Sequence, residues 1–242
     1  MLASTSLGIF ANVFPDNRWT KSFPASGYSR NLPLYQDGAG NIYTLIPNPD
    51  DLSVAPGPVM KSTDEGNSWF ADTAGLTSTI NGIFYVDDLG VQHLGSAFYG
   101  PNYSAMLYKK DPGSRWVADT SGFPVAPNSS VVDFASDRHG MLYVTGLLSG
   151  RRVMRRPPGG GPWVVDTSGI PSTTGYFVHM TSDTNGSMIG AAGPLLYRHV
   201  GGVWKLMNSP GGGIAAICVD ARGTLWTVCY ESVSGEEQFV GI

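Results

Sequence analysis

The chain has 242 residues, of which 42% are hydrophobic and 14% charged, and it contains 32 glycines and 17 prolines. This balance excludes a disordered chain and favours many short strands joined by turns. The net charge of −4 argues against a general nucleic-acid binder, which would normally show a basic face. No stretch approaches the roughly 18 apolar residues that a membrane helix needs, so we expect no membrane insertion.

A four-residue pattern, Asp-x-x-Gly, recurs along the chain with an apolar run on each side. Its five copies are Asp37–Gly40, Asp87–Gly90, Asp137–Gly140, Asp183–Gly186 and Asp220–Gly223. The aspartate side chain can accept hydrogen bonds from the turn backbone, and the glycine adopts a positive φ without steric cost. Each copy therefore predicts a tight hairpin, and the regular recurrence indicates one supersecondary unit repeated five times.

Two further markers run in step with these turns. A tryptophan follows an apolar patch and a Gly- or Pro-rich turn in every repeat, at Trp19, Trp69, Trp116, Trp163 and Trp204. A link sequence comes next, best preserved as Asp72-Thr-Ala-Gly75, Asp119-Thr-Ser-Gly122 and Asp166-Thr-Ser-Gly169. An aspartate that opens such a turn accepts bonds from the backbone, so we interpret these three as structural. A ligand-binding role for the same three aspartates is the alternative.

The three markers together divide each repeat into four strands. We predict an all-β fold: a five-bladed β-propeller of four-stranded antiparallel blades, in a single domain spanning 1–242. The repeat units run approximately over 20–69, 70–116, 117–163, 164–204, and 205–242 together with 7–19. Because the chain begins inside a unit, we expect the N-terminal strands to complete the last blade and close the ring. Glu236–Ile242 resembles a further strand, which competes with Ile9–Val13 for that place.

The histidines and cysteines do not form a recognisable metal motif. They are His93, His139, His179, His199, Cys218 and Cys229. The histidines are single and widely separated, and the cysteines lack the spacing of zinc ligands. The two cysteines flank the last predicted hairpin, where they either face each other or lie as reduced thiols in the β core. We therefore expect no metal and no cofactor.

One segment carries a family resemblance. Ser62-Thr-Asp-Glu-Gly-Asn-Ser-Trp69 matches the Asp-box pattern Ser-x-Asp-x-Gly-x-x-Trp. With its link and turn markers, the chain resembles the Asp-box (BNR-type) repeat propellers of bacteria, which include sialidases, photosystem assembly factors and lectins. The resemblance implies that the box is a structural turn between the two outer strands of a blade. Asp64 and Trp69 are accordingly expected to stabilise the fold.

The sequence does not present the groups that catalysis by such propellers needs. The resemblance implies an arginine triad on separate blades for a sialidase, but Arg151, Arg152, Arg155 and Arg156 cluster in one strand region. Other glycosidases need two carboxyl groups about 5 to 10 Å apart. Asp133 is the only acid within a predicted innermost strand, and a lone acid makes no pair. We therefore predict that the chain is not an enzyme.

Recognition is expected in the variable loops between the second and third strands of each blade, because loops on a rigid scaffold usually carry binding residues. Aromatic side chains beside an amide suit a sugar ring or a protein hot spot, and arginines suit an anionic ligand. The candidate ligand-binding residues are Asp50, Asp51, Phe98, Tyr99, Asn102, Tyr103, Arg151, Arg152, Tyr230 and Glu231.

These observations favour a non-catalytic, lectin-like carbohydrate-binding propeller. The alternatives are a protein-interaction scaffold or assembly factor, and an enzyme that acts on a polysaccharide. The partner is accordingly a glycan or another protein. An extracellular or cell-surface location is expected, although residues 1–8 show no basic region followed by a long apolar run that would predict a signal peptide.

Overall fold

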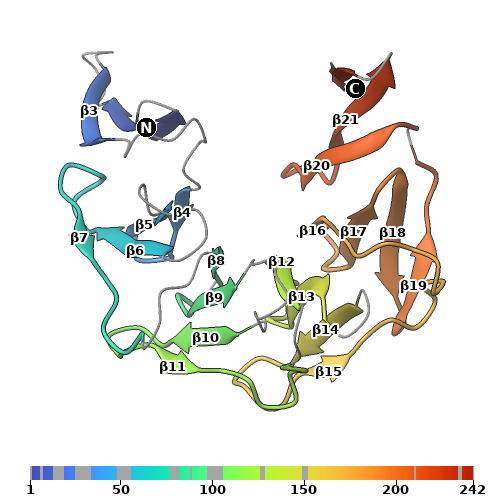
Figure 1. Ribbon diagram of the computed structural model, residues 1–242, viewed down its shortest axis with the longest axis horizontal. Coiled ribbons are helices and arrows are strands. Elements are labelled where there is room, and N and C mark those ends of the chain that lie inside the picture. The colour runs from blue at the N-terminus through green and yellow to red at the C-terminus, as the bar shows by residue number, and fades with distance from the viewer. Residues whose placement is uncertain are drawn as a thin grey trace. The chain divides into compact units, whose positions relative to one another are not determined.

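A computed structural model of the 242-residue chain contains only strands and turns in the part that it describes (Figure 1). The described residues are 2–5, 8–12, 19–24, 34–47, 56–76, 82–87, 89–96, 106–125, 129–148, 152–209, 211–233 and 236–241. The chain divides into two compact units: unit 1 comprises Met1–Ser96 and Leu107–Asp119, and unit 2 comprises Ala97–Met106 and Thr120–Ile242. The all-β prediction is confirmed, and the single domain stays a prediction.

The described residues of unit 1 form three antiparallel sheets, each from strands that follow one another in the sequence. The first has three strands, β1 (Leu2–Thr5), β2 (Gly8–Asn12) and β3 (Trp19–Pro24). The second has four, β4 (Leu34–Gln36), β5 (Ile42–Pro47), β6 (Pro56–Ser62) and β7 (Phe70–Ala71). The third has four, β8 (Gly82–Val86), β9 (Gln92–Ser96), β10 (Leu107–Lys110) and β11 (Val117–Ala118).

Unit 2 also contains three antiparallel sheets. Two have four strands: β12 (Ser130–Ser136), β13 (Leu142–Leu147), β14 (Arg152–Arg156) and β15 (Val164–Val165), then β16 (His179–Ser182), β17 (Met188–Ala192), β18 (Leu195–Val200) and β19 (Val203–Leu206). The last has three: β20 (Gly213–Val219), β21 (Leu225–Val233) and β22 (Glu236–Gly241). The four-stranded sheets thus follow the predicted repeat.

The sheets at the two ends of the chain differ from the prediction. The described residues form six sheets, in which β22 pairs with β21 and β2 pairs with β3. Glu236–Gly241 therefore occupies the third-strand place that we had assigned to the N-terminal segment. The two cysteines do not face each other either, because Cys218 lies opposite Trp226 and both thiols are free. The five-blade count and its mode of closure are not confirmed.

The Asp-x-x-Gly hairpins form as predicted. In the first, Asp37 Oδ1 accepts hydrogen bonds from the backbone N–H groups of Ala39 and Asn41, at 3.0 and 2.9 Å. The other four copies repeat both bonds, with acceptors Asp87, Asp137, Asp183 and Asp220. The closing glycine has a positive φ in every copy. These turns therefore form through local side-chain chemistry, which is readable from the sequence.

The link sequence fastens one sheet to the next within each unit. Trp116 donates its indole N–H to the Asp72 carbonyl and its backbone N–H to the Ala74 carbonyl, both at 2.8 Å. Trp204 repeats both bonds on Asp166 and Ser168 at the same distances. We call this arrangement the tryptophan clamp. It confirms that the links have a structural role.

A glycine ends each link because a larger residue would collide with the backbone of the clamped tryptophan. A Cβ added at Gly75, Gly122 or Gly169 would lie 2.2 to 2.4 Å from the carbonyl oxygen of the clamped tryptophan. All three glycines also have a positive φ, which other L-residues rarely adopt. The last residue of the link sequence is therefore fixed as glycine by two independent constraints.

The Asp box is the turn that connects β6 to β7, as the resemblance implied. Asp64 accepts hydrogen bonds from the hydroxyl of Ser62 and from the backbone N–H and hydroxyl of Ser68, at 2.6 to 2.8 Å. The indole N–H of Trp69 donates to the Gly66 carbonyl at 3.0 Å. Both residues stabilise this turn, which confirms their predicted structural role.

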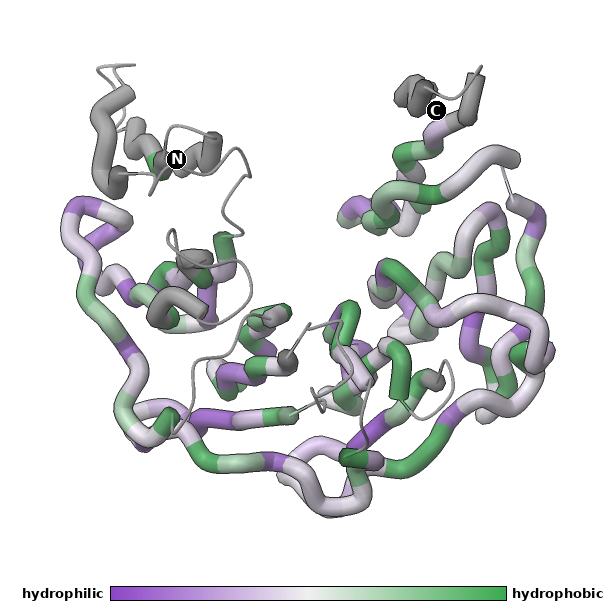
Figure 2. Tube along the Cα trace, viewed as in Figure 1, coloured by the Kyte–Doolittle hydropathy of each residue, from purple (hydrophilic) through white to green (hydrophobic). Residues whose placement is uncertain are grey.

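The core of unit 2 gathers around the aromatic side chains of its sheets. Phe177 packs edge-on against Trp204 with ring centroids 4.8 Å apart, and Tyr143 lies 6.3 Å from the same indole. Hydrophobic segments, green in Figure 2, run along the strands that carry this core. Unit 1 has a smaller equivalent in which Phe84 contacts Trp116 and Tyr43. Each tryptophan therefore combines a backbone clamp with aromatic packing.

Candidate functional site

The structure does not assemble a site from the residues predicted by sequence. Seven of them lie outside the described residues: Asp50, Asp51, Phe98, Tyr99, Asn102, Tyr103 and Arg151. Arg152 and Glu231 fall within β14 and β21. Tyr230 is half-buried on β21, where its ring lies over Gly213, so close that a Cβ there would be 2.3 Å away. Tyr230 thus has a packing role.

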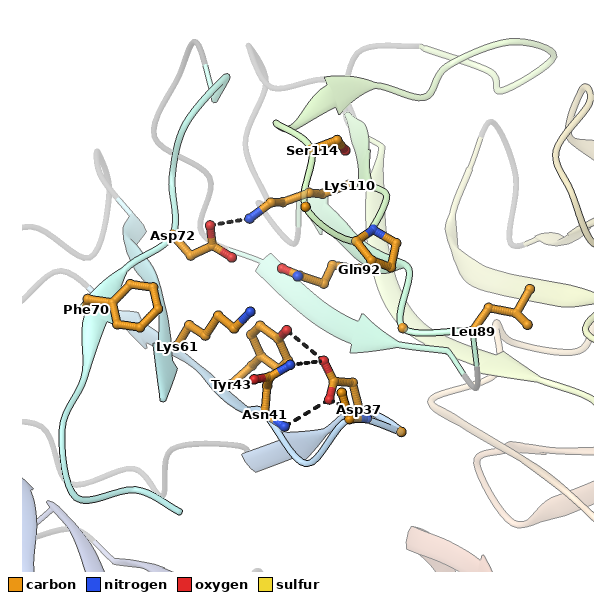
Figure 3. A pocket seen from close by; sticks show the side chains of 15 residues that line it. Asp37, Asn41, Tyr43, Lys61, Phe70, Asp72, Leu89, Gln92, Lys110 and Ser114 are labelled. Atoms are coloured by element: carbon orange, nitrogen blue, oxygen red, sulfur yellow. Dashed lines mark hydrogen bonds and ion pairs between the residues drawn. The ribbon is translucent and has the colours of Figure 1, made fainter. Parts of the chain in front are cut away.

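A polar pocket of about 670 Å³ lies in unit 1, between its two four-stranded sheets (Figure 3). One wall comes from the β4–β5 turn with the adjoining parts of β5, β6 and β7. The other comes from the start of β9, the end of β10 and the β10–β11 turn. Its charged and amide side chains are those of Asp37, Asn41, Lys61, Asp72, Gln92 and Lys110. This concentration of polar groups makes the pocket our candidate functional site.

Asp37 and Tyr43 form a saturated corner of the pocket. Asp37 Oδ2 accepts hydrogen bonds from the Tyr43 hydroxyl at 2.9 Å and from the Asn41 amide at 2.8 Å. Burial opposes ionisation of Asp37, but these bonds and those from the turn backbone lower its pKa below the usual value. Burial and the Asp37 carboxylate raise the pKa of Tyr43. The Asp37 carboxylate and the Tyr43 hydroxyl proton are therefore already engaged in hydrogen bonds within the protein.

Asp72 and Lys110 form a buried ion pair on the side of the pocket opposite Asp37 and Tyr43 (Figure 3). Lys110 Nζ donates to Asp72 Oδ1, and both side chains are about nine-tenths buried. The second carboxylate oxygen, Asp72 Oδ2, is buried and has no hydrogen-bond partner in the described part of the chain. The pair thus leaves one carboxylate oxygen uncommitted, and Figure 3 shows it on the side of Gln92.

Lys61 supplies a second positive charge. Its ammonium lies 5.4 Å from the centre of the Tyr43 ring, which is within the range of a cation–π contact. The described residues provide no carboxylate partner for it. An ammonium without a counter-ion attracts an oxygen that carries negative charge, whether in a ligand or in a transition state.

Gln92 completes the polar lining. Its side chain is buried, and its Oε1 has no hydrogen-bond partner among the residues that the structure describes. In Figure 3 its amide end points towards the side of the pocket where Asp72 and Lys61 lie. Counting only partners among the described residues, the pocket therefore holds two acceptors without a hydrogen-bond partner, Asp72 Oδ2 and Gln92 Oε1, and one cation without a carboxylate partner, Lys61.

Unit 2 contains a separate candidate in Asp133. The residue lies on β12 beside a bulge, and its carboxylate accepts N–H bonds from Phe134 at 2.9 Å and from Met180 of β16 at 2.6 Å. Burial raises the pKa of Asp133 to about 7, and the two N–H bonds counteract only part of that rise. A carboxyl group that titrates near neutrality can act as a general acid or base.

The sequence analysis named only part of this chemistry. It singled out Asp72 and Asp133 but overlooked Lys61, Gln92 and Lys110. Within the described residues, no three His, Cys, Asp or Glu side chains are grouped so that they could hold a metal ion. The described residues also contain no helix that is long and apolar enough to cross a membrane.

Comparisons with known proteins show the fold. No family model and no curated protein matches the chain, so membership of the Asp-box family stays a prediction. A gluconolactonase from Xanthomonas campestris matches with a TM-score of 0.61 at 11% identity, over 92% of this chain and 75% of its own. A structural-genomics target described as a "putative gluconolactonase" matches with a TM-score of 0.58 at 12% identity, over 91% of this chain and 77% of its own. A protein of unknown function from Dyadobacter fermentans matches at 0.55 and 14%, over 96% and 82%.

These neighbours confirm a β-propeller fold. They also contradict the prediction of a non-catalytic, lectin-like binding protein, because two of them are described as gluconolactonases, which are enzymes. The sequence reasoning failed here because it searched for pairs of carboxylates and for known sialidase motifs. It did not consider a single carboxylate paired with a lysine of the next sheet.

Proposed function

We propose that the chain is a hydrolase that opens a cyclic ester, a lactone, in the pocket of unit 1. The observation that carries the proposal is the buried Oδ2 of Asp72, which lacks a hydrogen-bond partner among the described residues, in a pocket with the Lys61 ammonium, which lacks a carboxylate partner among them. A general base accelerates the attack of water on an ester, and a nearby cation stabilises the oxyanion that forms. The choice of lactones is supported by the two neighbours described as gluconolactonases.

The reaction needs a water molecule that attacks the carbonyl carbon of the lactone. Asp72 Oδ2 accepts a proton from that water as the new C–O bond forms. Lys110 donates a hydrogen bond to the other carboxylate oxygen and so holds the base in position. The Lys61 ammonium stabilises the negative charge that develops on the carbonyl oxygen. The ring C–O bond then breaks, and the proton on Asp72 passes to the departing ring oxygen, which gives a hydroxy acid.

Asp133 is a second candidate for the base, because its pKa of about 7 suits a group that exchanges protons near neutral pH. Its two oxygens already accept backbone N–H bonds, however, which leaves it fewer free lone pairs than Asp72. We therefore place the chemistry at Asp72 and use Asp133 as the competing site in the test.

The test measures initial hydrolysis rates of δ-gluconolactone and δ-valerolactone by acid release, above the spontaneous rate. We expect Asp72→Asn to lower kcat at least about 100-fold, the usual contribution of a general base. Asp133→Asn and the exposed control Asp111→Asn are expected to retain the wild-type rate. Loss of activity in Asp133→Asn alone would move the site to unit 2. A wild-type protein without activity on either lactone would refute the proposal.

One control addresses folding. Asp72→Asn leaves the buried Lys110 without a counter-ion, which can destabilise the protein. The double variant Asp72→Asn with Lys110→Gln removes both charges and keeps polar groups of similar size. A folded but inactive double variant, judged by its unfolding transition, would support the assignment.

Closure of the propeller ring is also part of the proposal. We propose a closed ring, because a propeller leaves no long sheet edge open. A five-bladed ring closed by the N-terminal strands would require β22 to leave β21, with which it pairs over six residues from Val228↔Gly241 to Val233↔Glu236. Deletion of residues 236–242 tests this: five blades predict unchanged stability, whereas a structural β22 predicts a lower unfolding temperature.

A further inference from the structure

Gln92 stands at a position that is apolar in every other described sheet with an Asp-x-x-Gly hairpin. It is the fifth residue after the turn aspartate and the first residue of the second strand. The corresponding residues are Ile42, Leu142, Met188 and Leu225. The fold therefore needs only an apolar side chain at this position, and Gln92 departs from that requirement.

The departure has an energetic cost. Gln92 is only 2% exposed, and its Oε1 has no hydrogen-bond partner among the described residues. A buried polar group without a hydrogen-bond partner destabilises the folded state, because its desolvation is not compensated. Ile42 and Met188 fill the same position at 8% and 1% exposure without that cost. A residue that destabilises the fold and lines a pocket is best explained by a role in binding the ligand of that pocket.

The position of Gln92 places its amide among the reactive groups. Its register partner on β10 is Lys110, which holds Asp72, so Gln92 and Lys110 are cross-strand neighbours. All three residues line the same pocket. Figure 3 shows the amide end of Gln92 close in view to the uncommitted side of Asp72. A ligand that reaches Asp72 Oδ2 therefore also meets the Gln92 amide.

We propose that Gln92 is a specificity-determining residue that hydrogen-bonds a ring hydroxyl of the lactone. This inference rests on the proposed function and narrows its substrate class to hydroxylated lactones. A hydroxyl both donates and accepts, so it satisfies the amide whichever way the oxygen and nitrogen are turned. A plain alkyl lactone leaves the amide unpaired and is disfavoured, as expected for a site built around a polar group.

The test compares δ-gluconolactone, which carries ring hydroxyls, with δ-valerolactone, which has none. We expect Gln92→Met to lower kcat/KM for the hydroxylated lactone about 10- to 100-fold, the discrimination lost with one hydrogen bond to a buried polar group. The value for δ-valerolactone is expected to change much less. Gln36→Met is the matched control, since Gln36 is exposed at the end of β4 and does not line the pocket.

We expect Gln92→Met to fold, because the chain already buries a methionine, Met188, at the equivalent position of another sheet. Gln92→Met is therefore expected to unfold at the same or a higher denaturant concentration than the wild type. An equal loss of kcat/KM on both lactones would mean that Gln92 acts only on the general shape of the pocket. That result, or no change on either lactone, would overturn the inference while leaving the hydrolase proposal intact.

A binding measurement separates the two proposals. Calorimetric titration with gluconate, the hydroxy acid formed from δ-gluconolactone, reports on the hydroxyl contact without any catalysis. Binding that weakens in Gln92→Met but not in Gln36→Met supports the inference even if the wild type hydrolyses nothing. Binding that is equal in the wild type and Gln92→Met contradicts it even if the wild type is an active lactonase.

Discussion

Substitution of Gly169 by alanine tests the tryptophan clamp most directly. The new Cβ would lie 2.2 Å from the Trp204 carbonyl oxygen and 2.7 Å from Val203 Cγ1. Relief of that contact must move the strand that donates to Ser168 and Asp166 at 2.8 Å. The left-handed conformation costs alanine about 1–2 kcal/mol. Loss of the two hydrogen bonds adds about 0.5–1.5 kcal/mol each.

We therefore expect Gly169→Ala to lower the free energy of unfolding by about 2–5 kcal/mol, a large share of the 5–15 kcal/mol typical of a domain. Urea unfolding followed by tryptophan fluorescence measures it. Gly202→Ala is the matched control, because Gly202 has nearly the same φ, +82° against +87°, but nothing within 4 Å of its added Cβ. Equal losses in the two variants would show that backbone conformation alone is responsible and would refute the clamp argument.

Three further predictions concern single side chains. Trp116→Phe removes the indole N–H that bonds the Asp72 carbonyl at 2.8 Å, so the unfolding free energy should fall by about 1–3 kcal/mol; an unchanged urea midpoint would contradict the bond's role. Asp133 has a pKa raised to about 7, so it binds a proton more tightly when folded, and its contribution to stability should decline between about pH 4 and pH 7; Asp133→Asn should flatten that decline in unfolding curves measured across this range. Asp64 has a pKa lowered to about 2 by the two serines that bond it, so its contribution is present above about pH 4 and lost as the pH falls through about 2; Asp64→Ala should be less acid-sensitive than the wild type in the same measurement.

The hairpins and links could be read from the sequence because their causes are local. An aspartate closes its own turn by accepting N–H bonds from the residues two and four positions later, as Asp37 does with Ala39 and Asn41. The glycine that follows needs only its own backbone conformation. The same holds for the Asp box, where the turn bonds of Asp64 and the indole bond of Trp69 join residues within Ser62–Trp69. Short-range chemistry of this kind leaves few alternatives for the chain.

Strand pairing at the chain ends could not be read in this way. Glu236–Gly241 and Gly8–Asn12 both carry patterns suited to a third strand, and the choice between them depends on contacts far apart in the sequence. β22 reaches β21 through residues 234–235 alone, whereas an N-terminal strand must close a loop as long as the whole chain. Loop closure becomes more costly with length, which favours the local partner.

The pocket was missed for a related reason. Lys61 lies in one sheet, Asp72 directly follows the last strand of that sheet, and Gln92 and Lys110 lie in the next sheet. Their proximity therefore depends on how the two sheets pack within unit 1. The expectation that propellers bind ligands on their variable loops directed attention elsewhere. One signal was nevertheless present in the sequence: alignment of the repeats on the turn aspartate places Gln92 in a column of apolar residues.

The link aspartates show why structure and function are not exclusive alternatives at one residue. The tryptophan clamp uses the backbone carbonyl of Asp72, which any residue would provide. The Asp72 carboxylate takes no part in the clamp and can have a separate role. In unit 2 the equivalent Asp166 keeps the same carbonyl bond to Trp204, but its carboxylate lies 3.3 Å from His199 and 3.8 Å from Arg155 instead of pairing with a lysine. The repeated backbone contact therefore fixes where the carboxylate stands, while the partner on the next sheet is free to differ. A chemistry that appears at one link and not at another is what such a scaffold permits, and it explains why a single repeat can carry a site that its neighbours lack.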